Sequence, residues 1–233
     1  RGAVARGSLP GTSPPEWLPT ASGSPCWMNT MSMSLLPPGP GSQHLADIFV
    51  HVRILVGMIV GLGLTHLLRN FAELMERPGH RRVYWVHLAW AMFVFLYLLH
   101  FWWWEFRLVH VARWNFNIYV YISLYALLLY LLCAFTFSSS ADQYPGYRDY
   151  YYSRRHWFFG VLALVYLVDL GDTWIKGAGY FHAFGTEYLV RNIAHVVLAL
   201  VAIATRSPLY HGAFAVLALA YQVSWILRQF EFV

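Results

Sequence analysis

Residues 155–195 decide the fold, and they read RHWFFGVLALVYLVDLGDTWIKGAGYFHAFGTEYLVRNIAH. Two apolar segments lie in this stretch, joined by a short glycine-rich loop, and each is close to the roughly 20 residues that a membrane-spanning helix needs. The stretch therefore predicts two consecutive antiparallel helices. Six ionisable residues interrupt the apolar pattern: Asp169, Asp172, Lys176, Glu187, Arg191 and His195.

The composition of the whole chain has the same character. Of its 233 residues, 58% are hydrophobic and only 12% are charged, whereas a soluble domain carries about 25% charged residues. A protein with a lipid-facing belt accounts for the missing charge. The net charge of +5 comes from dispersed arginines and a single lysine, which suits anchoring at lipid headgroups better than binding of nucleic acid.

Six apolar runs follow one another along the chain. We place them near 48–68, 84–105, 117–138, 156–176, 186–205 and 208–229. Because backbone groups in lipid have to be hydrogen-bonded internally, single spans form helices. The sequence predicts an all-α protein, a bundle of six transmembrane helices over residues 47–233 in contact with the lipid bilayer.

Residues 1–46 are rich in proline, glycine and serine and contain no long apolar run, which predicts a disordered tail. The first methionine is Met28, which leaves open that residues 1–27 are upstream sequence that is not translated. Positive residues are more frequent in the first, third and fifth loops of the bundle, including Arg81, Arg82 and Arg206. By the positive-inside rule, both termini are expected to be extracytoplasmic.

The six ionisable residues form two stripes. Asp169, Asp172 and Lys176 share one helix face by their i, i+3, i+7 spacing, and Glu187, Arg191 and His195 share another by i, i+4, i+8. An unpaired charge at the middle of a span costs about 2.5–3.5 kcal/mol or more. We therefore expect the stripes to face each other, as a polar pocket, a proton relay or an ion path near the extracytoplasmic side. The alternative is structural, with charges near helix ends that reach the headgroups.

Four histidines permit a different hypothesis. His87 and His100 are separated by the same thirteen positions as His182 and His195, a separation of about 20 Å along a helix. This pattern resembles that of di-haem b cytochromes and ferric-reductase-like membrane domains, and the resemblance implies bis-histidine ligation of two b-type haems. Interfacial or hydrogen-bonded histidines are the alternative, and under it we expect no cofactor. No metal-ligand spacing occurs elsewhere.

Gly57 and Gly61 form a pair of small residues that permits close approach of another helix. Its partner is either a helix of the same bundle or a second copy of the chain in a homo-oligomer. No Walker loop, HExxH motif or GxSxG motif occurs. We therefore assign no catalytic residue. Whether the protein is an enzyme stays open, and the leading hypothesis is a non-enzymatic protein.

Several short motifs carry a family resemblance. They are Gly61-x-Gly63 with Thr65-His66-Leu67-Leu68, Tyr84-Trp85-Val86-His87-Leu88-x-Trp90, Phe101-Trp102-Trp103, Arg155-x-Trp157-Phe158-Phe159-Gly160 and Asp169-x-x-Asp172-Thr173. Over roughly residues 48–176 the chain resembles a group of uncharacterised bacterial multi-span membrane proteins. The resemblance implies a bacterial cytoplasmic (inner) membrane and no particular mechanism. The leading hypothesis is a small transporter or an ion- or proton-handling protein. A di-haem redox protein and a scaffolding or assembly subunit are the alternatives.

Overall fold

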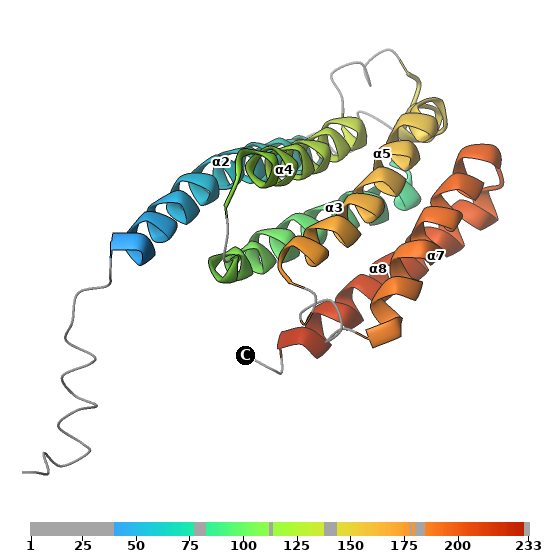
Figure 1. The fold of residues 1–233 in the computed structure, drawn as a ribbon. Helices are drawn as coiled ribbons and strands as arrows, with labels where there is room; N and C mark the ends of the chain where they lie inside the picture. Colours follow the sequence, from blue (N-terminus) through green and yellow to red (C-terminus); the bar gives the residue numbers. More distant parts are fainter. Residues whose placement is uncertain are drawn as a thin grey trace, which may run out of the picture. The chain divides into compact units, whose positions relative to one another are not determined.

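The computed structural model describes residues 40–76, 83–111, 114–137, 144–177, 179 and 185–230. These residues form six long helices and one short 3-10 helix (Figure 1). In chain order they are α2 (Pro40–Glu76), α3 (Trp85–Trp104), η1 (Glu105–His110), α4 (Phe116–Thr136), α5 (Tyr147–Ile175), α7 (Gly185–Ala204) and α8 (Pro208–Phe230). Residues 1–39, most of the expected disordered tail, lie outside the described residues, and α2 begins at Pro40, within the range 1–46 that we assigned to that tail.

Each of the six long helices is long and apolar enough to cross a membrane. The predicted fold class, an all-α bundle of six membrane-spanning helices, is confirmed. Large apolar side chains are exposed on the outer faces, among them Ile54, Leu62, Leu124, Leu200 and Leu217. Exposed apolar side chains around an already filled core are what contact with lipid requires, because lipid tails solvate them as well as a protein interior does.

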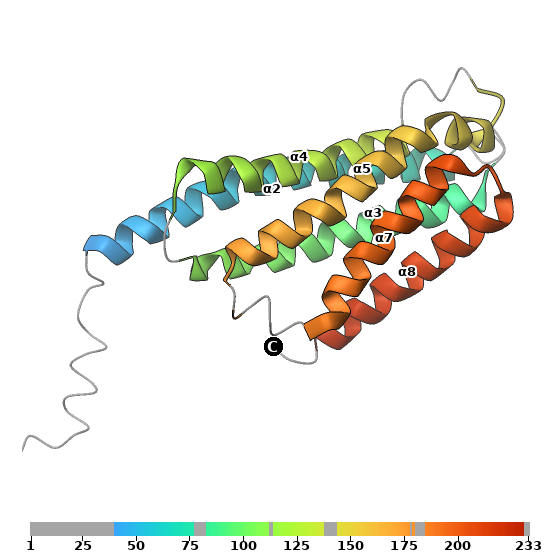
Figure 2. The same cartoon turned by 45° about the vertical axis from the view of Figure 1, so that its right-hand side comes forward.

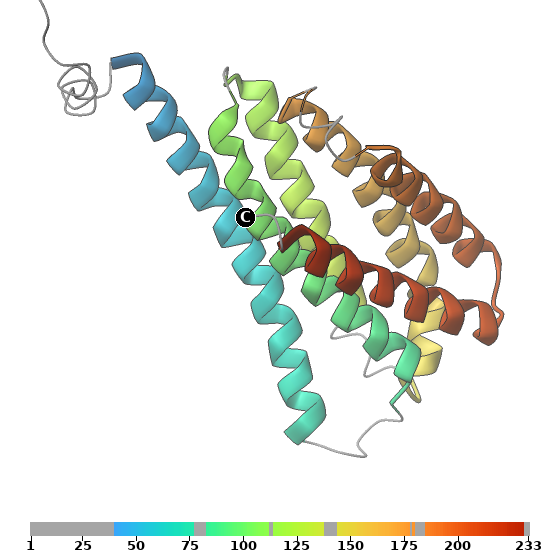
Figure 3. The same ribbon diagram turned by 90° about the horizontal axis from the view of Figure 1, so that it is seen from below.

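The helices pack around α3 and α5. Helix α5 lies between α4 and α7, and α3 packs against α8 and α4 (Figure 2). Viewed along another axis, α2 runs along one edge of the bundle (Figure 3). It presents a single buried stripe, Val52, Val56, Val60 and Leu67, to its neighbours, whose spacing of about four residues is that of one helix face.

Large aromatic side chains fill the centre of the bundle. The indole of Trp90 lies edge-on to the rings of Phe93, Phe158, Phe159 and Phe214, with ring centroids 4.9 to 5.5 Å apart. Edge-to-face contacts of this kind contribute about 0.5–1.5 kcal/mol each beyond the apolar area that they bury. This aromatic layer therefore connects α3, α5 and α8.

Helix α5 begins at Tyr147, well before the start near residue 156 that hydropathy predicts. Its first turns are polar in composition, but Tyr150, Tyr151 and Arg155 are buried there. The hydroxyl of Tyr150 donates to the carbonyl of Phe135 at 3.0 Å, and the Arg155 guanidinium donates to the carbonyl of Tyr152 at 2.8 Å. Buried tyrosine rings and these hydrogen bonds thus accompany the extension of the helix beyond its apolar run.

The predicted glycine pair divides between two environments. A Cβ on Gly57 would lie 2.7 Å from Cη2 of Trp102, whereas a Cβ on Gly61 would meet nothing within 4 Å. Gly57 therefore allows α2 to approach α3 within the bundle. A homo-oligomer that uses the Gly57/Gly61 face stays a prediction.

Candidate functional site

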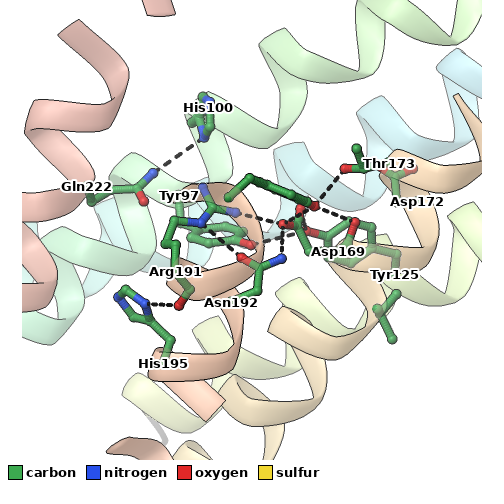
Figure 4. Close-up of polar contacts among 12 residues, drawn as sticks. Tyr97, His100, Tyr125, Asp169, Asp172, Thr173, Arg191, Asn192, His195 and Gln222 are labelled. Carbon is green, nitrogen blue, oxygen red and sulfur yellow. Dashed lines mark hydrogen bonds and ion pairs between the residues drawn. The ribbon is translucent and has the colours of Figure 1, made fainter. Parts of the chain in front are cut away.

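Asp169 and Arg191 join the two stripes of ionisable residues between α5 and α7, and Figure 4 shows Asp169 at the centre of the contacts. The carboxylate of Asp169 on α5 lies 2.7 Å from the guanidinium of Arg191 on α7. The side chains are 15% and 5% exposed, respectively. Helical periodicity places both residues on facing sides of adjacent antiparallel helices, and the ion pair joins the two arms of the hairpin.

Further donors surround the Asp169 carboxylate. Its Oδ1 accepts from the hydroxyl of Tyr125 on α4 at 2.9 Å, while Oδ2 accepts from Tyr188 at 2.8 Å and Asn192 at 3.0 Å. With Arg191, four side chains donate to this carboxylate, three of them to Oδ2 and one to Oδ1. The charge of Asp169 is therefore fully compensated by protein groups.

Arg191 is held as firmly as its partner. Its Nε donates to the side-chain oxygen of Asn192 at 2.9 Å. The guanidinium carbon also lies 4.8 Å from the ring centroid of Trp225 and 4.9 Å from that of Tyr188, close enough for cation–π attraction. Together, the carboxylate and the two rings surround a cation that is almost without contact to solvent.

His195 lies one helical turn beyond Arg191. Its ring nitrogen Nδ1 donates to the backbone carbonyl of Arg191 at 2.8 Å, and its ring stacks on Tyr166 with centroids 4.4 Å apart. No hydrogen bond among the described residues connects it to Asp169 or Asp172. His195 thus borders the ion pair without belonging to its hydrogen-bond network.

A second group forms at the end of α5. The ammonium of Lys176 lies 2.6 Å from Oδ2 of Asp172 and 2.8 Å from Oε1 of Glu105. All three side chains are 1 to 3% exposed. Both acidic side chains direct an oxygen to the ammonium, and opposite charge nearby favours its ionised form.

Glu105 was not among the predicted site residues. It follows directly after the three tryptophans that end α3, and it is 71 positions from Lys176 in the sequence. Helical periodicity links residues of one helix or of one hairpin, and no such pattern relates Glu105 to α5. The sequence signal that could have identified Glu105 is its position at the end of the second apolar run, on the same side of the membrane as Asp172 and Lys176.

Glu187 lies apart from the buried groups. Its carboxylate pairs with Arg228 on α8 at 2.7 Å and accepts from the hydroxyl of Tyr221 at 2.9 Å. The two charged side chains are about half exposed. Of the six predicted residues, Glu187 thus belongs to a surface ion pair, and the other five lie in or beside the buried network.

A small cavity lies between the two buried groups. Its volume is about 20 Å³, and Asp169, Arg191, Asp172 and Glu105 are among the residues that line it. This volume is sufficient for about one water molecule. Three buried polar atoms of lining residues have no hydrogen-bond partner among the described residues: Nε2 of His100, Oε2 of Glu105 and Oδ1 of Asp172.

The aromatic layer separates this cavity from polar residues at the other end of the bundle. There, the hydroxyl of Tyr151 lies 2.9 Å from Nδ1 of the buried His211. Trp90, Phe159 and Phe214 fill the space between the two levels with ring contacts. In this conformation the candidate site and the Tyr151–His211 pair are two separate polar levels.

The described structure does not bring the proposed haem ligands together as pairs. Nε2 of His87 lies 2.6 Å from the carbonyl oxygen of Thr136, and its ring stacks on Tyr147. The neighbours of the His100 ring are Trp104 and Gln222. The His195 ring contacts aromatic rings on α5 and α8 and bonds to the Arg191 carbonyl on α7, and His182 lies outside the described residues. Within the described ranges, no group of three or more His, Cys, Asp or Glu side chains is arranged to hold a metal ion. Haem binding stays a prediction.

The apolar outer faces, the helix lengths and the paired charges inside define a multi-pass α-helical membrane protein with six spans. No protein-family model, curated protein or solved structure matches the chain. The resemblance to bacterial membrane proteins thus gains no support from these comparisons, and the site has to be interpreted from its own chemistry.

Proposed function

We propose that this membrane protein is a non-enzymatic protein that handles protons or small ions. Its working site is the buried ionisable cluster, which consists of the Asp169–Arg191 pair and the group of Glu105, Asp172 and Lys176. The observation that carries the proposal is the water-sized cavity lined by three polar atoms that have no partner among the described residues. Charged groups inside membrane spans are costly, and they commonly mark proton relays and ion pathways. On the basis of the charge distribution and the resemblance, we propose a bacterial cytoplasmic membrane with both termini outside.

The size of the cavity favours an ion over an organic solute. Sites for drug-sized molecules enclose about 300–1,000 Å³, whereas this cavity measures about 20 Å³. A proton with its water fits such a space, and the carboxylate oxygens on the wall supply the charge that would bind it. The proposed transported species are therefore protons and small cations.

Two alternatives make different predictions. A scaffolding subunit would use the Asp169–Arg191 pair only to join α5 to α7. The four donors to Asp169 favour this structural role of the pair. A di-haem protein would show a Soret absorbance band after expression with sufficient haem. A colourless purified protein would remove the haem alternative.

Reconstitution into liposomes tests the proposal. Vesicles that contain the full chain and a pH-sensitive dye are exposed to a pH gradient with the membrane potential clamped. We expect proton entry above that of empty vesicles, and its loss in Glu105→Gln and Asp172→Asn. Glu187→Gln is the matched control, because it changes an acid of the same helical hairpin that lies outside the buried network.

Fluxes of sodium and potassium ions are measured in the same vesicles. If the wild-type protein passes none of the three ions faster than empty vesicles do, the proposed function is wrong. Equal flux in the wild type and in both cavity variants would place the ion path elsewhere in the bundle.

A further inference from the structure

The group around Lys176 contains unequal numbers of acids and bases. Asp169 and Arg191 balance each other in the neighbouring pair, but Glu105 and Asp172 share the single ammonium of Lys176. If both acids were ionised, one negative charge would stay without a counter-charge. The side chains of the three residues are only 1 to 3% exposed, so water provides little compensation.

An uncompensated carboxylate at such a position is unfavourable. Removing an ion from water is unfavourable even after the protein relaxes, and a buried acid commonly becomes neutral by binding a proton. When two carboxyl groups share a site, one of them takes up the proton first and the other stays ionised. One proton is enough to make the group of Glu105, Asp172 and Lys176 neutral.

We propose that Glu105 and Asp172 hold one proton between them, and that this proton is the ion which the site handles. The inference rests on the proposed function of the cluster and names both its ion and its binding residues. It also assigns different roles to the two buried acids of α5. Asp172 takes part in proton binding, and Asp169 holds α5 and α7 together.

The positions of the free oxygens locate the proton. Each acid directs one oxygen to Lys176, Oε1 of Glu105 and Oδ2 of Asp172, and the other oxygen has no partner among the described residues. Both acids line the cavity. Uptake converts one carboxylate and a hydronium ion in the cavity into a carboxyl group and water, with the new O–H bond on one of these free oxygens.

His100 supplies a third group at the cavity. The side-chain amide of Gln222 lies 3.4 Å from its Nδ1. If that amide donates, Nδ1 is the acceptor and Nε2 carries the hydrogen of the neutral ring. This Nε2 is also without a partner in the described ranges. It can therefore donate a hydrogen bond to a water in the cavity, and that water can donate to the two acids.

The surrounding groups favour a proton over a metal cation. Lys176 already occupies the position between the carboxylates where a metal ion would bind. The titratable or charged residues that face the cavity from the packed helices are Tyr97 and His100 on α3, Tyr125 on α4, Asp169 on α5, and Tyr188 and Arg191 on α7. The charge of Arg191 is balanced by Asp169, and the tyrosine hydroxyls are neutral donors, so these residues offer no further anionic ligand to a metal ion.

Infrared spectroscopy of the full-length protein in lipid nanodiscs tests this inference. A protonated carboxyl group has a C=O stretching band that is resolved from those of carboxylates and shifts in D2O. We expect such a band at neutral pH in the wild-type protein. Exposed acids are ionised under this condition and do not contribute.

Substitutions change the number of buried acids in a defined way. Glu105→Gln and Asp172→Asn each leave one acid against one ammonium, so the band should be lost in both. Lys176→Met leaves two acids without a cation, and the band should roughly double as both become neutral. Glu187→Gln should leave the band unchanged.

Absence of the band in the wild type, or its persistence in both Glu105→Gln and Asp172→Asn, overturns the inference. These results are separate from those of the liposome assay. Ion flux that requires the two acids but is accompanied by no carboxyl band would retain the proposed function and reject the bound proton. The reverse result would retain the bound proton and reject its transfer across the membrane.

Discussion

At the scale of single residues, the Asp169–Arg191 pair and the Lys176 group differ in how completely they are satisfied. Every charge in the first has partners, including two aromatic rings beside the guanidinium. In the second, two carboxylate oxygens have none within the described ranges. A polar network that is fully satisfied holds one conformation rigidly, whereas a partly satisfied one costs free energy unless water or a proton completes it.

This difference predicts how the first pair affects stability. Asp169→Asn or Arg191→Gln leaves one buried charge without its partner, and each should lower the free energy of unfolding by about 3–5 kcal/mol. The double variant should lose much less than the sum of the two, because it removes both charges. Denaturation in mixed detergent micelles measures these values.

Glu187→Gln provides the comparison on the surface. It breaks a half-exposed ion pair with Arg228, and we expect a loss of no more than about 1 kcal/mol. Equal losses for Arg191→Gln and Glu187→Gln would contradict a buried, structural role of the Asp169–Arg191 pair.

At the scale of the helices, close approach depends on particular glycines. A Cβ on Gly171 of α5 would collide with the hydroxyl of Tyr121 on α4, which donates to the carbonyl of Val168 at 2.7 Å. On the same helix, Gly160 faces open space. The contact between α4 and α5 next to the candidate site therefore requires glycine at the first position and permits alanine at the second.

Alanine substitutions test this contact. Gly171→Ala should destabilise the protein by about 1–3 kcal/mol, the usual cost of overpacking, and its thermal unfolding should begin at a lower temperature. Gly160→Ala should keep the wild-type transition or raise it slightly, since alanine is the better helix former. If Gly171→Ala unfolds like the wild type, α4 and α5 are not as close as described.

The glycines of α2 provide a second test at this scale. Gly57→Ala should weaken the contact with Trp102 and cost about 1–3 kcal/mol. Gly61→Ala should leave the stability of the monomer unchanged. If the Gly57/Gly61 face forms a homo-oligomer, Gly61→Leu should shift the protein to a smaller species in size-exclusion chromatography with light scattering.

At the scale of the whole molecule, an even number of spans places the start of the first helix and the end of the sixth on the same side of the membrane. The distribution of arginines predicts that this side is extracytoplasmic. In a variant without Cys26, Thr186→Cys should react with a membrane-impermeant maleimide applied to intact cells, and Ser207→Cys should react only after lysis. Both positions are exposed in the structure, while Cys133 is buried. The opposite labelling pattern would show that both ends of the helical bundle lie in the cytoplasm.

Much of the architecture follows from sequence because the rules that govern spans are local. Hydropathy predicts each helix of the bundle, and its least accurate boundary is the start of α5, where buried tyrosines and Arg155 extend the helix by hydrogen bonding. Helical periodicity also predicts which residues of α5 and α7 face each other. Asp169 and Arg191 are consequently found opposite one another in the structure.

The sequence alone determined that the chain forms six apolar helices, because lipid accepts only a backbone whose hydrogen bonds are made within the span. It also determined that acids and bases share faces of one hairpin. Only the tertiary structure decided that Glu105 joins Lys176 and Asp172, and that Glu187 turns to Arg228 instead. The physical reason is that the rotation of each helix about its axis is set by side-chain packing between helices distant in sequence, which no local spacing records.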